Sequence, residues 1–212
     1  MIPAHEALQR LQEGNQRFTS NVRSLDAFMS HARREEFSKN QAPFAIILGC
    51  SDSRVPAEIV FDQGLGDLFV IRVAGNIVAP SQVGSVEFAA AAYATKLVVV
   101  LGHSQCGAIL ATIEELKRPT ANQSRYLRSI VDRVRPSVEG LLETELRNNL
   151  DALVECAVRQ NIRASTNHLK HASELLENMI QDEGLLVVGA EYSLETGAVD
   201  FFDGMPVDFQ PV

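Results

Sequence analysis

FAIILGCSDSR, at residues 44–54, joins a short apolar run to a polar segment that contains a cysteine, an aspartate and an arginine. A continuous apolar run of this length is typical of a strand buried on both faces of a sheet. KLVVVLGHSQCG, at residues 96–107, has the same organisation, with a histidine and a cysteine after the apolar run. Because ligands bind beyond the carboxyl ends of the strands in parallel sheets, we expect the two polar segments to meet at one sheet edge.

Strand-like and helical patterns alternate along the rest of the chain. Apolar runs at 67–73 and 185–192 predict two more strands, and Glu195-Thr196-Gly197 predicts a hairpin into a short antiparallel strand at 198–202. Helices are predicted at 4–18, 23–38, 81–94, 105–117, 122–139 and 146–182. The expected fold is therefore α/β: a mainly parallel sheet of four strands plus an antiparallel edge strand, flanked by helices, with an N-terminal helical extension.

Length and composition indicate one globular domain over residues 1–212. Hydrophobic residues make up 46% of the chain and charged residues 22%, which excludes disorder of the whole chain. The formal net charge of −8 disfavours nucleic acids and anionic membranes as partners, since both repel an acidic surface. No apolar run reaches the roughly 20 residues that span a bilayer, and the amphipathic N-terminus lacks the apolar core of a signal peptide, so we expect a cytoplasmic protein.

The polar segments at the two strand ends carry residues that bind metals. Two thiolates and one imidazole, from Cys50, Cys106 and His103, are ligands that zinc prefers. Three protein ligands leave a fourth position for water, as in catalytic sites, whereas Asp52 as a fourth ligand would close the site. Arg54 could hold Asp52 bidentately and so decide between these states. Zinc lowers the pKa of bound water to about 7, and the resulting hydroxide can attack a small electrophilic carbon.

Other interpretations fit the same residues. Cys50 and Cys106 could be buried thiols, with His103 as an ordinary capping residue, or the zinc could be purely structural. A redox pair is a further alternative, although the chain has no Cys-x-x-Cys motif. The convergence of these residues at matching strand ends favours the metal site. Cys156 falls in a helical pattern and is expected to be a small buried apolar residue.

The segments CSDSR and HSQCG resemble those of the β-class carbonic anhydrases, and the similarity extends over nearly the whole chain. The resemblance implies Zn²⁺ ligation by the two cysteines and the histidine, with Asp52 and Arg54 as a catalytic dyad. It implies reversible hydration of carbon dioxide to bicarbonate and a proton by zinc-bound hydroxide. It also implies at least a homodimer, possibly a tetramer, with the active site at the subunit interface and the arm of residues 1–40 packed on a partner subunit.

The resemblance assigns further residues to the substrate pocket. Gln41 matches a glutamine that hydrogen-bonds substrate, while Phe69 and Phe88 match rings that line a narrow apolar pocket, partly from the neighbouring subunit. Such a pocket suits carbon dioxide, which is small and uncharged. Ala74 lies in a segment that departs from the pattern of one large branch and alters a pocket wall. Ile47 occupies the place of a tryptophan that some bacterial members use for allosteric bicarbonate binding, so we expect that regulation to be absent or changed.

Two rival functions remain open from the sequence. A carbon disulfide or carbonyl sulfide hydrolase could use the same scaffold, because those substrates are also linear and apolar. A non-catalytic zinc-binding assembly subunit would keep Asp52 permanently on the metal. The CSDSR form favours carbonic anhydrase over the first rival, and the Asp52–Arg54 pair argues against the second, since a structural site has no evident need for that arginine.

Overall fold

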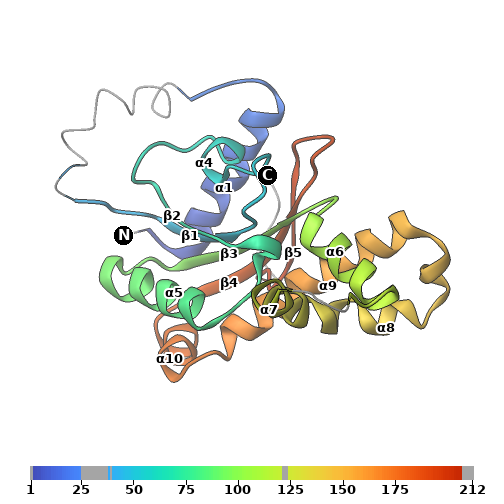
Figure 1. The fold of residues 1–212 in the computed structure, drawn as a ribbon. Coiled ribbons are helices and arrows are strands. Elements are labelled where there is room, and N and C mark those ends of the chain that lie inside the picture. Colours follow the sequence, from blue (N-terminus) through green and yellow to red (C-terminus); the bar gives the residue numbers. More distant parts are fainter. Residues whose placement is uncertain (1, 25–37, 39, 121–123, 207–212) are drawn as a thin grey trace.

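The sheet has five strands in the order β2-β1-β3-β4-β5, and only β5 is antiparallel to its neighbour (Figure 1). The structure is a computed structural model that describes residues 2–24, 38, 40–120 and 124–206. The strands are β1 (Ala45–Gly49), β2 (Leu68–Arg72), β3 (Leu97–His103), β4 (Leu186–Tyr192) and β5 (Val199–Asp203). β2, β4 and β5 lie within one residue of the predicted bounds, β1 and β3 lie in the apolar runs that open residues 44–54 and 96–107, and the predicted fold class is confirmed.

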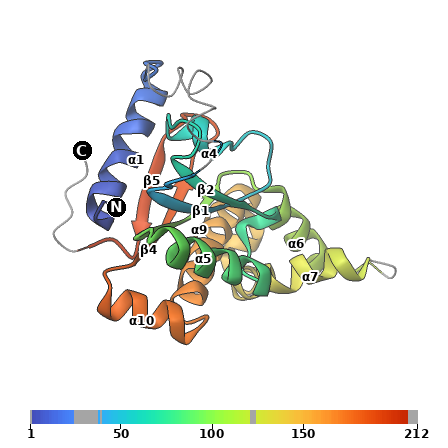
Figure 2. The ribbon, with the colours of Figure 1, turned by 90° about the vertical axis from the view of Figure 1, so that its left-hand side faces the viewer.

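Helices cover both faces of the sheet (Figures 1 and 2). One face carries α1 (Ala4–Thr19) and α4 (Ala57–Val60), and the other carries α5 (Pro80–Tyr93), α6 (Gly107–Lys117), α9 (Leu150–Lys170) and α10 (Glu174–Asp182). The segment between α6 and α9 contains α7 (Arg125–Val134), η2 (Arg135–Ser137), α8 (Glu139–Leu142) and η3 (Glu145–Asn148), and η1 (Ala74–Asn76) follows β2. None of the helices in the described residues is long and apolar enough to cross a membrane.

The sheet has an apolar layer on each face, which explains why the sequences of its strands are continuous apolar runs. Successive side chains of a strand point to opposite faces. In β1, Ile46 and Leu48 pack toward α5 and α9, whereas Ala45 and Ile47 pack toward α1. All four are fully buried, so neither face of this central strand tolerates a polar residue.

Two predicted helices are broken where the sequence supplies a new helix start or a proline. The predicted helix 146–182 divides into η3, α9 and α10, because the Ser173 side chain accepts a hydrogen bond from the Leu176 N–H and caps α10. The predicted helix 122–139 divides at Pro136, which lies in η2. The predicted helix 23–38 lies almost wholly outside the described residues. Cys156 is half-buried on α9, so the prediction of a buried residue was too strong.

The N-terminal helix α1 lies on the sheet of its own chain. Leu8 and Leu11 are fully buried in the layer below α1. At Gly14 the helix approaches the end of α4 so closely that an added Cβ would lie 1.9 Å from the Phe61 carbonyl oxygen. Most of the arm beyond Ser24 is outside the described residues, and its packing on a partner subunit stays a prediction.

Substitution of Gly14 tests the close contact between α1 and the Phe61 carbonyl group. Gly14→Ala should lower the free energy of unfolding by about 1–3 kcal/mol, because the methyl group cannot fit against the Phe61 carbonyl. In an open helix the same change would raise it by up to about 1 kcal/mol. Gly140→Ala in α8, where an added Cβ meets no described atom within 4 Å, is the control. Urea unfolding of both variants measures the difference, and equal effects would contradict the contact.

Candidate metal centre

The register of β1 and β3 brings the two predicted segments together. Gly49, the last residue of β1, pairs with Leu101, so Cys50 follows beside the end of β3 where His103 lies. Cys106 is the N-cap residue of α6. The ligand atoms of Cys50, His103 and Cys106 all lie within 4.8 Å of one another, and all three residues are buried. Residues more than fifty positions apart therefore form one compact donor set.

His103 is oriented for metal binding. Its Nδ1 lies 2.8 Å from the Ser104 carbonyl oxygen. Because a carbonyl can only accept, Nδ1 carries the proton and Nε2 presents a lone pair. Nε2 is buried and has no hydrogen-bond partner among the described residues. A buried acceptor without a partner is costly unless it binds something, and two sulfur ligands lie beside it, so these residues fit a zinc ion.

The two thiols interact as a buried pair. The hydrogen bond from Cys106 lowers the pKa of the Cys50 thiol despite burial, and the backbone N–H groups of Asp52 and Gly75 contribute further. The pKa of Cys106 is raised, because it donates to Cys50 and is itself buried. The protein alone thus stabilises one thiolate of the pair. A divalent cation between the sulfurs would make both of them thiolates at neutral pH.

Two arginines shape the loop that follows Cys50. Arg54 donates from Nε to Asp52 Oδ1 (2.9 Å) and from Nη2 to Asp52 Oδ2 (2.7 Å), a bidentate pair. This hydrogen bonding holds the pKa of Asp52 well below its usual range. Arg72 donates to the carbonyl oxygens of Cys50 (3.0 Å) and Asp52 (2.5 Å). Asp52 Oδ2 lies 3.8 Å from His103 Nε2, so the carboxylate stands at the edge of the donor set.

The predicted pocket residues form a separate cluster within the single chain. Gln41 donates to the Tyr93 hydroxyl at 2.7 Å. The rings of Phe69, Phe88 and Tyr93 stand 5.7–6.2 Å apart, and Phe88 is 54% exposed. Phe69 is three residues before the end of β2, which places it roughly 10 Å along the strand from the metal loop. One chain thus brings these residues to one another but not to the metal ligands.

Sequence reasoning missed two residues here. Tyr93 joins the aromatic cluster, and its signal was an aromatic residue near the end of the helix that carries Phe88. Arg72 holds the loop carbonyls, for which the sequence contains no signal, because the contact depends on the β1–β2 register. Ala74 is half-buried in η1, immediately before the residue whose N–H faces Cys50.

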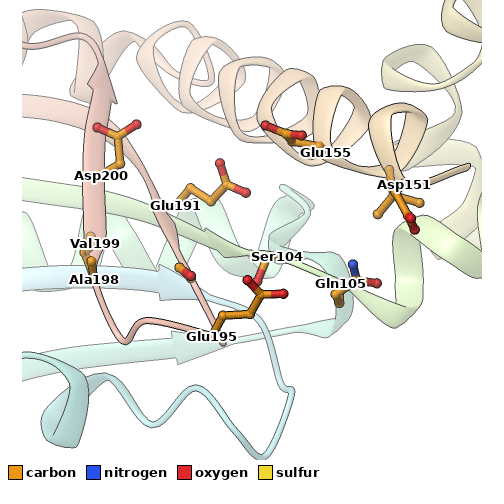
Figure 3. Close-up of a pocket in the computed structure, with 11 residues that line it drawn as sticks. Ser104, Gln105, Asp151, Glu155, Glu191, Glu195, Ala198, Val199 and Asp200 are labelled. Atoms are coloured by element: carbon orange, nitrogen blue, oxygen red, sulfur yellow. The ribbon is translucent and has the colours of Figure 1, made fainter. Parts of the chain in front are cut away.

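A pocket of about 510 Å³ lies beside the metal loop, with Ser104 and Gln105 in its wall (Figure 3). Acidic side chains surround it: Asp151, Glu155, Glu191, Glu195 and Asp200. Arg159 pairs with Glu191 (3.1 Å) and Asp200 (2.8 Å), and the remaining carboxylates leave an excess of negative charge. Such a pocket repels bicarbonate, so it is not suited to hold that anion.

Two cysteines, one histidine and an arginine-held aspartate, gathered at the carboxyl ends of neighbouring parallel strands, define a zinc enzyme on an α/β fold. Known proteins are similar to this chain in sequence and in fold. The carbonic anhydrase family profile matches residues 45–199. Carbonic anhydrase 2 of Mycobacterium tuberculosis is 38% identical over 191 residues, covering 90% of this chain and 89% of that protein.

Further relatives agree. The carbonic anhydrase of Mycolicibacterium smegmatis is 36% identical over 194 residues, covering 92% of this chain and 91% of that protein. The crystal structure of the β-carbonic anhydrase CafA of Aspergillus fumigatus superimposes with a TM-score of 0.73 at 26% identity, over 85% of this chain and 86% of that one. This chain belongs to the carbonic anhydrase family, in its β class, whose members are zinc enzymes that hydrate carbon dioxide. The relatives favour neither rival function.

The donor set predicts which cysteines bind metal. Cys106→Ser should remove most bound zinc, because one of three clustered ligands is replaced by a poor one. Cys156→Ser, on α9 outside the cluster, should keep the wild-type content of about one ion per chain. Elemental analysis after dialysis against a weak chelator measures this. Full retention of zinc by Cys106→Ser would contradict the assignment.

Proposed function

We propose that this chain hydrates carbon dioxide reversibly with Cys50, His103 and Cys106 as zinc ligands and Asp52 and Arg54 as the catalytic pair. The observation that carries the proposal is the placement of the Asp52 carboxylate. Its Oδ2 accepts a hydrogen bond from Arg54 Nη2 at 2.7 Å and lies 3.8 Å from His103 Nε2. When bound, zinc would supply a Lewis acid that makes a hydroxide nucleophile available near neutral pH.

Asp52 orients the nucleophile in this proposal. Because its pKa is held low by Arg54, it is a carboxylate at neutral pH and can only accept hydrogen bonds. An attacking hydroxyl group that donates to Asp52 turns its lone pair toward the carbon of the substrate. Both Asp52 oxygens are engaged by Arg54, which supports an open site with three protein ligands. A closed site would require Asp52 to leave Arg54.

We further propose that the substrate pocket is completed by a second copy of the chain. Phe88 is exposed beside Phe69, and an exposed aromatic cluster of this kind is typical of a subunit contact. A partner that presents these rings and Gln41 to the metal centre would give carbon dioxide an apolar site with one amide donor. The functional unit is then a homodimer at least, with a tetramer as a possible larger assembly.

The proposed location is the cytoplasm. Cys50 and Cys106 lie close enough for their sulfurs to share one metal ion, and two such thiols are open to oxidation. A reducing compartment keeps both available as metal ligands.

Asp52→Asn should lower the turnover of carbon dioxide hydration by roughly 100-fold or more, because the amide can donate to the hydroxyl group and misorient it. Zinc content should stay at the wild-type level, since the three ligands remain. Stopped-flow hydration assays with elemental analysis on the same samples measure both quantities.

Asp132→Asn is the matched control. Asp132 also faces an arginine, Arg135, at 3.5 Å, but both side chains are exposed at the surface of α7 and neither belongs to the donor set. This variant should hydrate carbon dioxide at the wild-type rate. Wild-type turnover in zinc-loaded Asp52→Asn would rule out the role given to Asp52.

Phe88→Arg should convert the protein to monomers and abolish most activity, because a charged side chain replaces an exposed ring at the proposed contact. Leu127→Arg, on α7 and exposed to a similar 59%, is the control and should leave mass and activity unchanged. Light scattering coupled to gel filtration gives the mass. An active Phe88→Arg dimer would disprove the shared pocket.

A further inference from the structure

The Cys50 sulfur receives a hydrogen bond from the backbone. The Gly75 N–H donates to Cys50 Sγ at 3.4 Å. The carbonyl group of the same residue accepts a hydrogen bond from Asn161 Nδ2 at 2.8 Å. Cys50, at the end of β1, is thus linked through one residue of η1 to the middle of α9.

Gly75 needs such an anchor. Its φ is +70°, in the left-handed region that glycine adopts without strain, and a Cβ there would lie 3.0 Å from the Ala108 Cβ. Glycine has the freest backbone of all residues, so the local sequence alone does not keep the Gly75 N–H directed at Cys50. The Asn161 bond to the Gly75 carbonyl restricts this residue to one orientation.

Asn161 is a polar residue on an apolar helix face. It is 2% exposed and lies among Val158, Ile162 and other buried residues of α9. A buried amide without a hydrogen bond costs roughly 1–3 kcal/mol, so its placement there calls for a partner, and the Gly75 carbonyl is that partner. Ile162, the next residue, packs so closely on Gly102 that a Cβ added to Gly102 would lie 2.6 Å from it. This turn of α9 therefore abuts η1, whose Gly75 contacts Cys50, and β3, which ends at His103.

We propose that Asn161 is a positioning residue for the metal centre, acting through the Gly75 peptide on the Cys50 thiolate. By holding Gly75, it maintains an N–H···S bond that draws charge from the sulfur. A thiolate that shares its charge with a hydrogen-bond donor gives less electron density to a bound metal, which leaves the metal a stronger Lewis acid. The inference rests on the proposed metal centre and adds a residue that touches neither metal nor substrate.

Replacing zinc with cobalt(II) allows the electron donation of the Cys50 sulfur to be measured directly. In the cobalt-loaded protein, thiolate-to-cobalt charge-transfer absorption reports how tightly the sulfur holds its electrons. Asn161→Leu, which keeps the side-chain size and removes the donor, should move this absorption to lower energy, because the sulfur loses part of its N–H···S bond. The affinity for zinc, measured by chelator competition, should fall roughly tenfold or more, because the loss of a fixed position for Cys50 outweighs the stronger electron donation of its sulfur. Asn161→Ala, which only removes atoms, gives the same readout if the leucine variant does not fold.

Asn15→Leu is the matched control. Asn15 is also a buried asparagine, and it donates to the Val60 and Gly197 carbonyls from α1, which covers the face of the sheet opposite to α9. This variant should lose stability yet keep the wild-type absorption and zinc affinity. An unshifted band in both Asn161 variants, or an equal shift in Asn15→Leu, would overturn the inference alone. Wild-type protein without any thiolate-to-cobalt absorption would overturn the metal centre and the inference together.

Discussion

The parallel pairing of β1 with β3 is the constraint on which the rest of the site depends. β1 lies between β2 and β3, so the chain leaves β1 toward one neighbour and later returns to the other. This reversal opens a crevice at the carboxyl ends of the strands, where loops from both sides of β1 can meet. The Gly49–Leu101 register then places Cys50 beside His103. A slip by one residue would send either side chain to the wrong face of the sheet.

The loop around the donor set is held mainly by backbone groups and arginines. Arg72 binds two loop carbonyls, Arg54 binds both oxygens of Asp52, and the Gly75 N–H reaches the Cys50 sulfur. These donors supply positive electrostatic potential around two sulfurs and a carboxylate within a chain of net charge −8. The same donors would favour an anionic product there, whereas the neighbouring pocket beside Gln105 is lined by carboxylates. A short loop thus separates a region of positive electrostatic potential at the donor set from a region of negative potential in the neighbouring pocket.

In the proposed function, a single chain carries the whole metal donor set but only part of the substrate pocket. The metal ligands and Asp52 come from elements that pair directly, so their geometry is settled within one subunit. The aromatic cluster lies on β2 and α5, where Phe88 is left exposed, and Gln41, in the segment before β1, donates to its Tyr93. Covering exposed apolar area of this kind with another surface lowers the free energy. In the proposed dimer, assembly therefore also completes the pocket.

The sequence by itself determined the strands and the residues proposed as metal ligands, because buried strands require uninterrupted apolar runs and zinc prefers soft donors such as those at their ends. It also determined the family, through two short segments read together. It contained the local signals that break the long helical patterns, the Ser173 cap and Pro136, although the predicted helices ran across both. Tertiary structure alone decided that Arg72 holds the loop and that Asn161 reaches Gly75. Those contacts join residues distant in the chain, and no local periodicity encodes a register between elements.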